Sequence, residues 1–464
     1  MPWRGLWGLL LVSACSGGGG QPDIQPPEQE PPAPLAGAEA PPTVAAPQLP
    51  AAAAGGPAHR PPGWPAREGF AGSSVSADYR CASDDRGNWV CALDLAGTPN
   101  KTYPGPCAFG PHGELVASWQ TLWSDVEASA IITHFGTPRW TRIWNRNGGY
   151  PTHTIGANDL RVHPDGRVVW AGRDCVHDSQ LPAALDPGYY KGSCIDAYVA
   201  TLSTTGDLLW QRWLGTRDAA DLASDLALAP DGGVYVAGIY QPPFSIDGLL
   251  QEGPNGNSDF FVLALDRDGT ARWARRFGSP EHEGDRMSLA ATPQGLAVHG
   301  NLTHAGAGLG VAAMLDLNGG VRWRTEGLPH SLGDTVWLAG EVLIPNGNEL
   351  LVLGELGELE RRSVAAPAPY LQMRATPQGT LMLWTTGSPL VEITPAGQVL
   401  RQYSVGDAAE RWYHGGMCVS AVGAVAITST VGPDTHFDFL REPFDLPLGA
   451  AFVMHLADWQ HLSQ

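Results

Sequence analysis

The densest group of possible metal ligands in the sequence is the stretch EHEGD, which contains Glu281, His282, Glu283 and Asp285. One imidazole together with several carboxylates can bind a transition-metal ion. The stretch connects two repeat units, however, and charged residues in such connections are usually solvated. We therefore expect a surface loop here rather than a metal site.

Two other stretches contain residue types that ligate metals. LDRDG supplies Asp266 and Asp268, as a calcium loop does, but the related stretches LSTTG and LDLNG lack this pair, which favours a plain hairpin turn. RDCVHDSQ places His177 two residues after Cys175, and both residue types bind zinc. A further cysteine, Cys194, favours a disulfide instead in an exported protein. The sequence thus predicts neither a metal nor another cofactor.

Neither catalytic signatures nor a basic composition is found in the sequence. It contains no Gly-x-Ser-x-Gly elbow, no His-Glu-x-x-His motif and no Walker-type phosphate loop. The formal net charge is −19, whereas nucleic-acid binding requires concentrated Lys and Arg. We expect a protein that is not an enzyme and does not bind nucleic acid.

One aromatic pair is a weak candidate for ligand recognition. Tyr189 and Tyr190 lie in the insert VHDSQLPAALDPGYYKGS. Aromatic residues on loops above a rigid scaffold are common contact points for partners. The alternative, that the two rings pack within their own loop, is equally open.

The elements that carry these residues are short repeats. Half of the repeat unit is Pro-x-Gly followed by alternating apolar residues. Its copies are PHGELVAS from Pro111, PDGRVVWAG from Pro164, PDGGVYVAG from Pro230, PQGLAVHG from Pro293, PNGNELLVLG from Pro345, PQGTLMLWTTG from Pro377 and the looser SAVGAVAITST from Ser420. The other half is an apolar strand, a turn with glycine, and a tryptophan four residues later. These glycine and tryptophan pairs are Gly136/Trp140, Gly206/Trp210, Gly269/Trp273 and Gly319/Trp323.

Each half of the unit predicts a β-hairpin, because the turns supply glycine and the flanks alternate with a period of two. Two hairpins make a four-stranded antiparallel sheet, which buries its faces only against neighbouring sheets. We therefore predict an all-β protein, a β-propeller of about seven blades in which the tryptophans fill the gaps between blades. The last unit has only three strands, so the segment 74–95 is expected to close it.

The stretch DLALAPDGGVYVAGIY, followed by an insert and DFFVLALDRDGTARWARRFG, resembles the bacterial seven-bladed β-propeller repeat family. The match is close over 158–278, partial over 107–149 and 285–327, and faint beyond. The resemblance implies an exported propeller. It carries over no catalytic or binding residues, because the shared positions are structural.

The N-terminus MPWRGLWGLLLVSAC is similar to that of bacterial lipoproteins, in which small residues precede a lipidated cysteine. This resemblance implies a signal peptide over 1–14, lipid on Cys15 and, with Ser16 next, an outer-membrane location. An ordinary secretory peptide is the alternative. Residues 15–68 are rich in Pro, Gly and Ala and predict a disordered tether, which leaves 69–464 for the propeller.

With Cys15 assigned to the lipid, six cysteines remain, an even number that suggests three disulfides in an oxidising compartment. Six cysteines allow 15 pairings. Our preferred pairs are Cys175 with Cys194, Cys107 with Cys418, and Cys81 with Cys91.

These features together predict a non-catalytic lipoprotein of the outer membrane. Its monomeric head would present loops or a sheet edge to another protein or to a glycan of the cell envelope. A second hypothesis is a scaffold role, since propeller lipoproteins of the outer-membrane β-barrel assembly machinery have a similar Gly-x-x-x-Trp rhythm, although the longer inserts here depart from it. A third is an enzyme acting on polysaccharide, because propellers host such activities.

Overall fold

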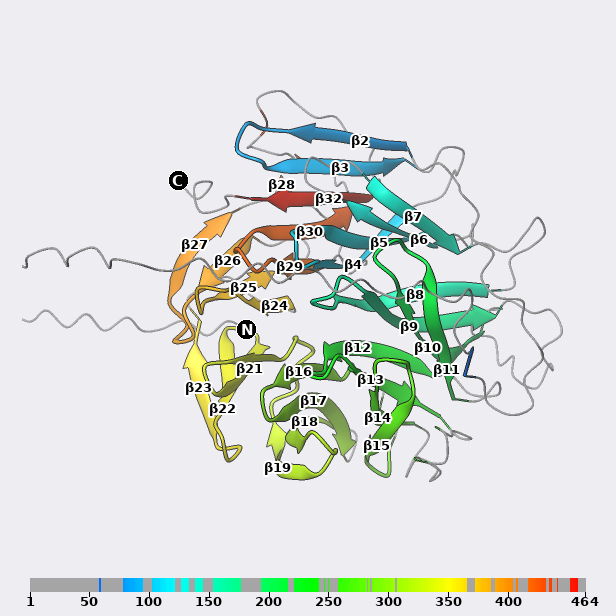
Figure 1. Ribbon diagram of the computed structural model, residues 1–464. Coiled ribbons are helices and arrows are strands. Elements are labelled where there is room, and N and C mark those ends of the chain that lie inside the picture. The colour runs from blue at the N-terminus through cyan, green and yellow to red at the C-terminus, as the bar shows by residue number, and fades with distance from the viewer. Residues whose placement is uncertain are drawn as a thin grey trace, which may run out of the picture. The chain divides into compact units, whose positions relative to one another are not determined.

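The chain is all-β in the computed structural model (Figure 1). The structure describes residues 58–59, 78–94, 102–121, 127–132, 138–144, 153–176, 193–215, 221–241, 246, 249, 258–281, 283, 286–304, 307–364, 372–384, 389–403, 406–407, 416–430, 434–435, 440 and 451–457. Within these ranges every regular element is a strand, and none contains a helix that could cross a membrane.

Six blades are each built from four consecutive antiparallel strands. The first three comprise β4 (Thr102–Phe109), β5 (Leu115–Thr121), β6 (Glu127–Ile132) and β7 (Pro138–Trp144); β8 (His153–Val162), β9 (Val168–Val176), β10 (Ser193–Leu202) and β11 (Leu208–Leu214); and β12 (Leu222–Leu228), β13 (Val234–Tyr240), β14 (Asp259–Leu265) and β15 (Ala271–Phe277). The next three comprise β16 (Ser288–Thr292), β17 (Gly295–His304), β18 (Ala307–Asp316) and β19 (Val321–Leu328); β20 (Val336–Leu338), β21 (Glu341–Asn346), β22 (Glu349–Leu353) and β23 (Leu359–Ser363); and β24 (Gln372–Ala375), β25 (Leu381–Trp384), β26 (Leu390–Ile393) and β27 (Val399–Tyr403).

A further sheet of a different kind lies between the sixth and first blades, and we call it the closing sheet. Its five strands come from both ends of the described chain, in the order β2 (Asp78–Ser83), β3 (Trp89–Asp94), β32 (Ala451–Leu456), β30 (Val425–Thr430) and β29 (Met417–Val419). The number of regular four-stranded blades is therefore six, fewer than the seven expected. The reason is that the last repeat copy supplies only three strands, and a hairpin from segment 74–95 pairs with β32 through β3.

The first strand of each blade contacts the first strands of its two neighbours. These inner strands are β4, β8, β12, β16, β20 and β24, and β29 of the closing sheet contacts both β24 and β4. The sheets thus form a closed ring around a common axis (Figure 1). This arrangement confirms the predicted all-β propeller of four-stranded antiparallel blades.

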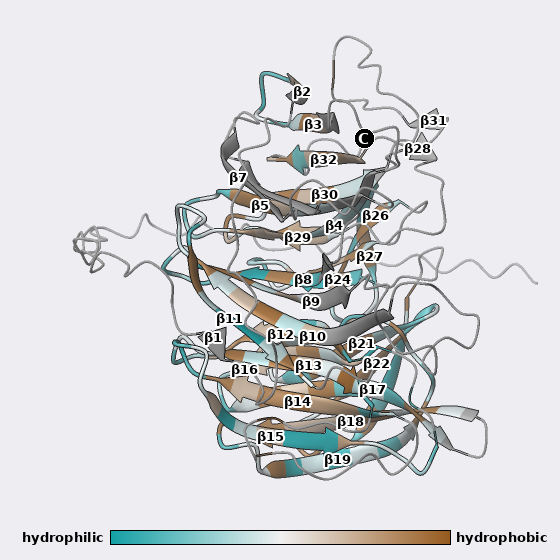
Figure 2. Cartoon of the chain, turned by 90° about the vertical axis from the view of Figure 1, so that its right-hand side faces the viewer, coloured by the Kyte–Doolittle hydropathy of each residue, from teal (hydrophilic) through white to brown (hydrophobic). Residues whose placement is uncertain are grey.

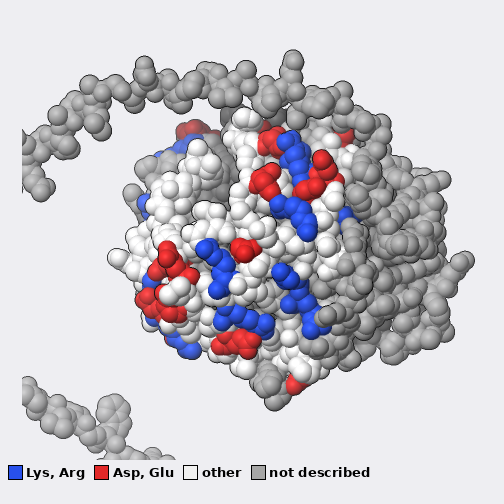
Figure 3. All heavy atoms as spheres, turned by 60° about the horizontal axis from the view of Figure 1, so that its bottom comes forward, with Lys and Arg blue, Asp and Glu red and all other residues white. Residues whose placement is uncertain are grey.

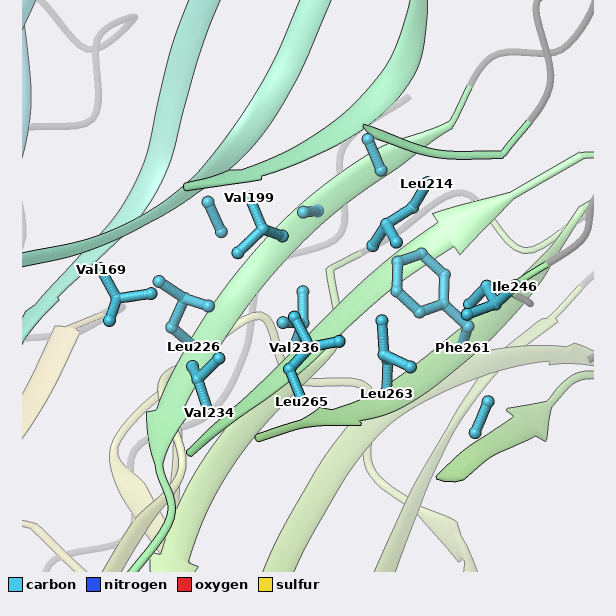
Figure 4. Close-up of a cluster of buried hydrophobic side chains, with 14 of the residues drawn as sticks. Val169, Val199, Leu214, Leu226, Val234, Val236, Ile246, Phe261, Leu263 and Leu265 are labelled. Atoms are coloured by element: carbon cyan, nitrogen blue, oxygen red, sulfur yellow. The ribbon is translucent and has the colours of Figure 1, made fainter. Parts of the chain in front are cut away.

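The hydrophobic core lies between neighbouring blades rather than within any one sheet. Figure 4 shows Val169 and Val199 of the second blade meeting Leu226, Val236 and other side chains of the third. Burial falls toward the outside of a blade: all seven residues of β14 are buried, whereas β15 is only partly buried and largely hydrophilic (Figure 2). Stacking against neighbours is therefore what removes each sheet from water.

The Pro-x-Gly motifs form the first turn of their blades, with one exception. Pro345 lies at the second turn of the fifth blade, between β21 and β22, so the repeat start expected there was wrong. The first turn of this blade is the two-residue turn of Ala339 and Gly340, between the paired residues Leu338 and Glu341. Both turn residues have positive φ, 53° and 92°, as a tight type I′ hairpin requires.

Two short pairings lie outside the blades. The strand β1 (Ala58–His59) pairs in parallel with the outer strand β11, Ala58 opposite Gln211. It lies within segment 15–68, the rest of which falls outside the described residues, so the tether expected there stays a prediction. The strands β28 (Gly406–Asp407) and β31 (Asp434–Thr435) form a separate two-stranded sheet.

Two disulfides link described residues. Cys81 and Cys91 join β2 to β3, and Cys107 of β4 is bonded to Cys418 of β29, across the closure of the ring. The third expected pair falls on β9 and β10, whose register places Cys175 and Cys194 opposite one another. Their side chains lie outside the described part, so this bond stays a prediction.

Candidate functional site

The recurring tryptophans lie on the fourth strand of a blade, against the third turn of the next blade. The three described pairs are Trp210–Gly269, Trp273–Gly319 and Trp323–Gly357. A Cβ added to Gly269 would lie 2.7 Å from Cδ2 of Trp210, and the glycine also has a φ of +83°. Only glycine therefore fits beneath the ring. The side chain of Trp140 lies outside the described residues.

A hydrogen bond fixes each of these contacts. The side chain two residues after the tryptophan donates to the carbonyl oxygen of the same glycine, from Arg212 Nη1 to Gly269 at 2.7 Å and from Arg275 Nε to Gly319 at 2.6 Å. Thr325 Oγ1 does the same to the oxygen of Gly357 at 2.7 Å. The repeated pattern of glycine, three residues and tryptophan thus forms the contact between neighbouring blades. We call this set of tryptophan–glycine contacts the seam.

Five of the nine large hydrophobic side chains that are exposed among the described residues lie on the third turns and fourth strands of three consecutive blades. We call this set the aliphatic rim, and its members are Leu317, Val321, Leu356, Leu359 and Leu400. Leu356 is the most exposed, at 85%. The rim begins on the fourth blade, which still carries Trp323, and continues over the fifth and sixth blades, whose fourth strands carry Arg361 and Arg401 in place of the tryptophan.

The charged residues beside the rim are paired with one another. Arg361 lies 3.6 Å from Glu349, and Arg362 contacts both Glu341 and Glu360, at 2.7 and 2.9 Å. Hydrogen bonds to these two carboxylates raise the pKa of Arg362 above its ordinary value. Figure 3 shows this balance over the described face, with basic and acidic side chains interleaved rather than separated. Apolar side chains bordered by polar ones are the usual make-up of a protein interface.

A second candidate site lies at the inner strands, where six charged side chains form one connected group. We call it the axial network, and its members are Asp159, Arg161, Asp225, Arg286, Asp334 and Arg374. They come from β8, β12, β24 and the segments that lead into β16 and β20. Acids and bases alternate along the group, so each carboxylate has at least one guanidinium beside it.

Asp225 is the best-connected member of the axial network. Its Oδ2 accepts hydrogen bonds from Ser288 Oγ at 2.9 Å and from the backbone N–H of Leu289 at 2.8 Å. Its Oδ1 accepts from Arg161 Nη2 at 3.3 Å. One carboxylate thus joins the second, third and fourth blades.

Asp334 links the fourth, fifth and sixth blades in the same way. Its Oδ1 lies 3.0 Å from Arg286 Nη2, and its Oδ2 accepts a short hydrogen bond from Arg374 Nη1. Arg374 Nη1 also donates to the backbone oxygen of Met373 at 2.8 Å. The network therefore ties five of the inner strands together electrostatically.

The pKa values of two neighbouring carboxyl groups of the network, Asp159 and Asp225, are shifted in opposite directions. Burial raises the pKa of Asp159 to about 8, although Arg161 opposes this effect, and the nearby Asp225 adds to it. Burial also acts on Asp225, but Arg286 and Arg161 outweigh it and lower its pKa below the ordinary value. Both carboxyl groups accept from the backbone N–H of Leu226, each at 2.9 Å. The raised pKa of Asp159 favours its protonated form near neutral pH, and the lowered pKa of Asp225 favours its ionised form.

A cavity of about 240 Å³ lies beside this network. Its lining comes from five inner strands or the residues before them and consists of Cys107, Ala108, Phe109, Arg161, Val162, Thr335, Val336, Met373, Arg374, Ala375, Cys418 and Val419. Most of the lining side chains are apolar, and Arg161 and Arg374 are its charged members. The disulfide Cys107–Cys418 is part of the wall.

The structure gives the sequence candidates other roles. Glu283, expected in a solvated loop, is buried and accepts backbone hydrogen bonds from Ser279 and Thr303, at 2.8 and 2.6 Å. Asp266 accepts from the backbone of Asp268 and Thr270, which makes LDRDG a hairpin turn. Within the described residues no group of three His, Cys, Asp or Glu side chains could hold a metal.

Several other candidates lie outside the described residues: Cys15, Tyr189, Tyr190, His282 and Asp285. Sequence reasoning also missed the axial network entirely. A signal for part of it is visible in retrospect, because Asp159 and Asp225 stand at the same distance before Pro164 and Pro230.

The fold and the two sites define a β-propeller with an aliphatic rim outside and a charged network inside. No family model and no curated protein matches the sequence. Among solved structures, one similar fold is the gluconolactonase XC5397 from Xanthomonas campestris, with 16% identity over 68% of this chain and 94% of that one. Another is BamB from Moraxella catarrhalis, with 13% identity over 68% and 96%. The TM-score is 0.35 for each.

Proposed function

We propose that this chain is a lipid-anchored protein of the outer membrane whose propeller head binds a partner protein through the aliphatic rim. The observation that carries the binding role is the exposure of five aliphatic side chains on three consecutive blades, bordered by paired charges. Exposed apolar side chains that gather on one part of a soluble head are typical of a protein interaction site. The proposal includes no catalytic step.

A protein partner is favoured over a glycan by the chemistry of the exposed side chains. Among the described residues, every large hydrophobic side chain that is exposed is aliphatic. Leucine and valine bury well against apolar side chains of another protein. They offer a sugar neither hydrogen bonds nor an aromatic face.

Export is supported by the sequence of the N-terminus and by the two disulfides, because such bonds persist in oxidising compartments. We expect the full-length protein to fractionate with the outer membrane. The variant Cys15→Ala removes the acceptor thiol, and we expect it to appear in the soluble fraction. Outer-membrane retention of this variant would contradict the lipid anchor without bearing on the rim.

The binding role is tested by placing a photo-crosslinking amino acid at position 356 of the full-length protein in cells. The matched control is position 422, because Val422 is 83% exposed but lies on the turn between β29 and β30 of the closing sheet, which carries no member of the rim. We expect one heterologous adduct from position 356 and none from position 422. That adduct should disappear when Leu359→Glu is added, because a charge would be buried in the interface.

Two results would overturn the rim as a partner site. One is an adduct whose mass equals two copies of this chain, which would make the rim a self-association surface. The other is the same adduct from positions 356 and 422, which would show contact without specificity.

A further inference from the structure

We propose that the disulfide between Cys81 and Cys91 is a site of thiol–disulfide exchange, and that its cleavage releases the strand β2 from the closing sheet. The two cysteines stand directly opposite one another on the antiparallel strands β2 and β3. The bond lies at the outer edge of the closing sheet, whereas the rim lies on the fourth, fifth and sixth blades. The inference therefore goes beyond the proposed function and does not depend on it.

The two bonded cysteines differ in their exposure. Cys81 is exposed, whereas Cys91 is 0% exposed and belongs to the buried cluster that the closing sheet shares with the first blade. Exchange begins when a thiolate bonds to one sulfur of a disulfide, so access decides which sulfur reacts. Cys81 is therefore the residue that an external thiol attacks.

The place of the bond in the sheet favours the same sulfur. A thiolate approaches in line with the bond that breaks, from the side opposite the leaving sulfur. For Cys81 this side is the open edge beyond β2, which has no further strand next to it in the described chain. For Cys91 it is the side of β32, where the buried Val453 is paired with Cys91. The sheet thus leaves one sulfur open to attack and blocks the other.

The reductant that fits this site is a dithiol, and the exchange balances in two steps. In the first, one thiolate of the dithiol bonds to Cys81 Sγ, the bond to Cys91 breaks, and Cys91 leaves as a thiolate that takes up a proton. In the second, the other thiol closes the dithiol into its own disulfide and releases Cys81 as a thiol. The cysteines gain the two electrons and two protons that the dithiol loses. An external disulfide restores the bond by the same steps in reverse.

Packing holds β2 only weakly once the bond is broken. Its described side chains, those of Cys81, Ala82 and Ser83, are exposed or half-buried. The strand β3, by contrast, is buried at Trp89 and Val90 and pairs with β32 on its other side. Reduction should therefore free β2 and leave β3 as an apolar edge of the closing sheet. Such an edge is the kind that accepts an added strand.

The first test uses the unaltered full-length protein in its native state. The protein is incubated briefly with excess glutathione, a monothiol whose first product is the mixed disulfide, and is then alkylated and mapped by peptide mass spectrometry. We expect glutathione on Cys81 and the alkyl group on Cys91. The internal control is the bond between Cys107 and Cys418, whose residues are 3% and 5% exposed, and it should react at least tenfold more slowly.

The variant Cys81→Ser tests the release of β2, because it removes the bond and leaves no exposed thiol. The control is Ser83→Ala, which changes another exposed residue of β2 and keeps the bond. We expect the amide hydrogens of β2 to exchange at least tenfold faster in Cys81→Ser and at an unchanged rate in Ser83→Ala, while the pairing of β3 with β32 stays protected in both.

Four results would overturn the proposal. They are glutathione on Cys91 instead of Cys81, equal reaction rates of the two disulfides, no reaction of either disulfide in the native state, and unchanged protection of β2 in Cys81→Ser. The first three come from the unaltered chain, so they decide the exchange site even if the variant does not fold.

Discussion

Asp159 and Asp225 occupy the same position in two successive repeats, five residues before the proline of each Pro-x-Gly motif, yet their surroundings give them different charges. Asp225 faces two arginines and accepts from three further donors, whereas Asp159 has Arg161 and one shared N–H. Burial penalises a charge, so the carboxyl group with fewer partners keeps its proton. This difference can be measured with a pair of identical substitutions.

We expect Asp225→Asn to lower the free energy of unfolding by about 3–5 kcal/mol at neutral pH, because it leaves Arg161 and Arg286 facing a neutral amide in a buried place. Asp159→Asn replaces a group that is already neutral and should cost much less. Denaturant unfolding of both variants measures the difference. Equal losses would contradict the assignment of the proton to Asp159.

The pH dependence of Asp159 gives an independent prediction at the same scale. Its pKa is raised from 3.8 in the unfolded chain to about 8 in the fold, so its contribution to stability is full at low pH and is lost as the pH rises through this window. The unaltered chain should therefore lose stability relative to Asp159→Asn between about pH 5 and about pH 8, by up to about 1 kcal/mol per pH unit. Parallel stability curves would contradict the raised pKa.

At the scale of the strand and the turn, the contact between blades depends on the absence of a Cβ atom at a glycine. At Gly269 a Cβ would meet Trp210 at 2.7 Å, whereas at Gly379 it would meet nothing within 4 Å. Both residues have positive φ, +83° and +77°, so alanine pays the same backbone cost of about 1–2 kcal/mol at each.

We expect Gly379→Ala to show that backbone cost alone. Gly269→Ala should add roughly 1–3 kcal/mol for overpacking against the ring, and it should shift the tryptophan fluorescence of the folded state. Thermal and denaturant unfolding of the two variants measure the extra loss. The seam would be of no energetic importance if the two variants were equally stable.

The hairpins could be predicted from the sequence because a turn and its flanks are local. Alternation of apolar residues and a glycine with positive φ leave a pattern within about ten residues, and the third turns at Gly269 and Gly319 follow it. The same logic failed at Pro345, because Pro-x-Gly describes a turn and does not say which turn of the blade it is. The true first turn, with Ala339 at positive φ, has no proline and no usual signature.

The axial network could not be predicted because its members are brought together only by ring closure. Asp225, Arg286 and Asp334 come from different repeats, and in the sequence each stands far from the partners that it meets in the fold. Only some copies of the repeat carry these charges: Asp159 and Asp225 share one position, whereas the copy before Pro293 has Ser288 there. The aliphatic rim was missed for the opposite reason, because exposed leucines in a strand cannot be told from buried ones by type.

At the scale of the whole molecule, the ring closes through a sheet made from both ends of the described chain. The closing sheet and the first blade share a buried cluster that includes Trp89, Trp119 and Val453. The bond between Cys107 and Cys418 crosses this interface, and Thr428 Oγ1 donates to the backbone oxygen of Gly105 at 2.5 Å. Closure thus rests on packing, a hydrogen bond and a covalent link.

The two disulfides should differ in what they contribute, because they close loops of very different length. Cys107 and Cys418 are 311 residues apart, whereas Cys81 and Cys91 are 10 apart. In the loop-entropy model the long link is worth about 5–6 kcal/mol and the short one about 3 kcal/mol. We expect Cys107→Ala with Cys418→Ala to lower the free energy of unfolding more than Cys81→Ala with Cys91→Ala does. Denaturant unfolding without reductant measures both double variants, and the packed interface should keep the first one folded. If the short link proved the more important, the ring would be held closed by its apolar interface, and the covalent bond would be dispensable.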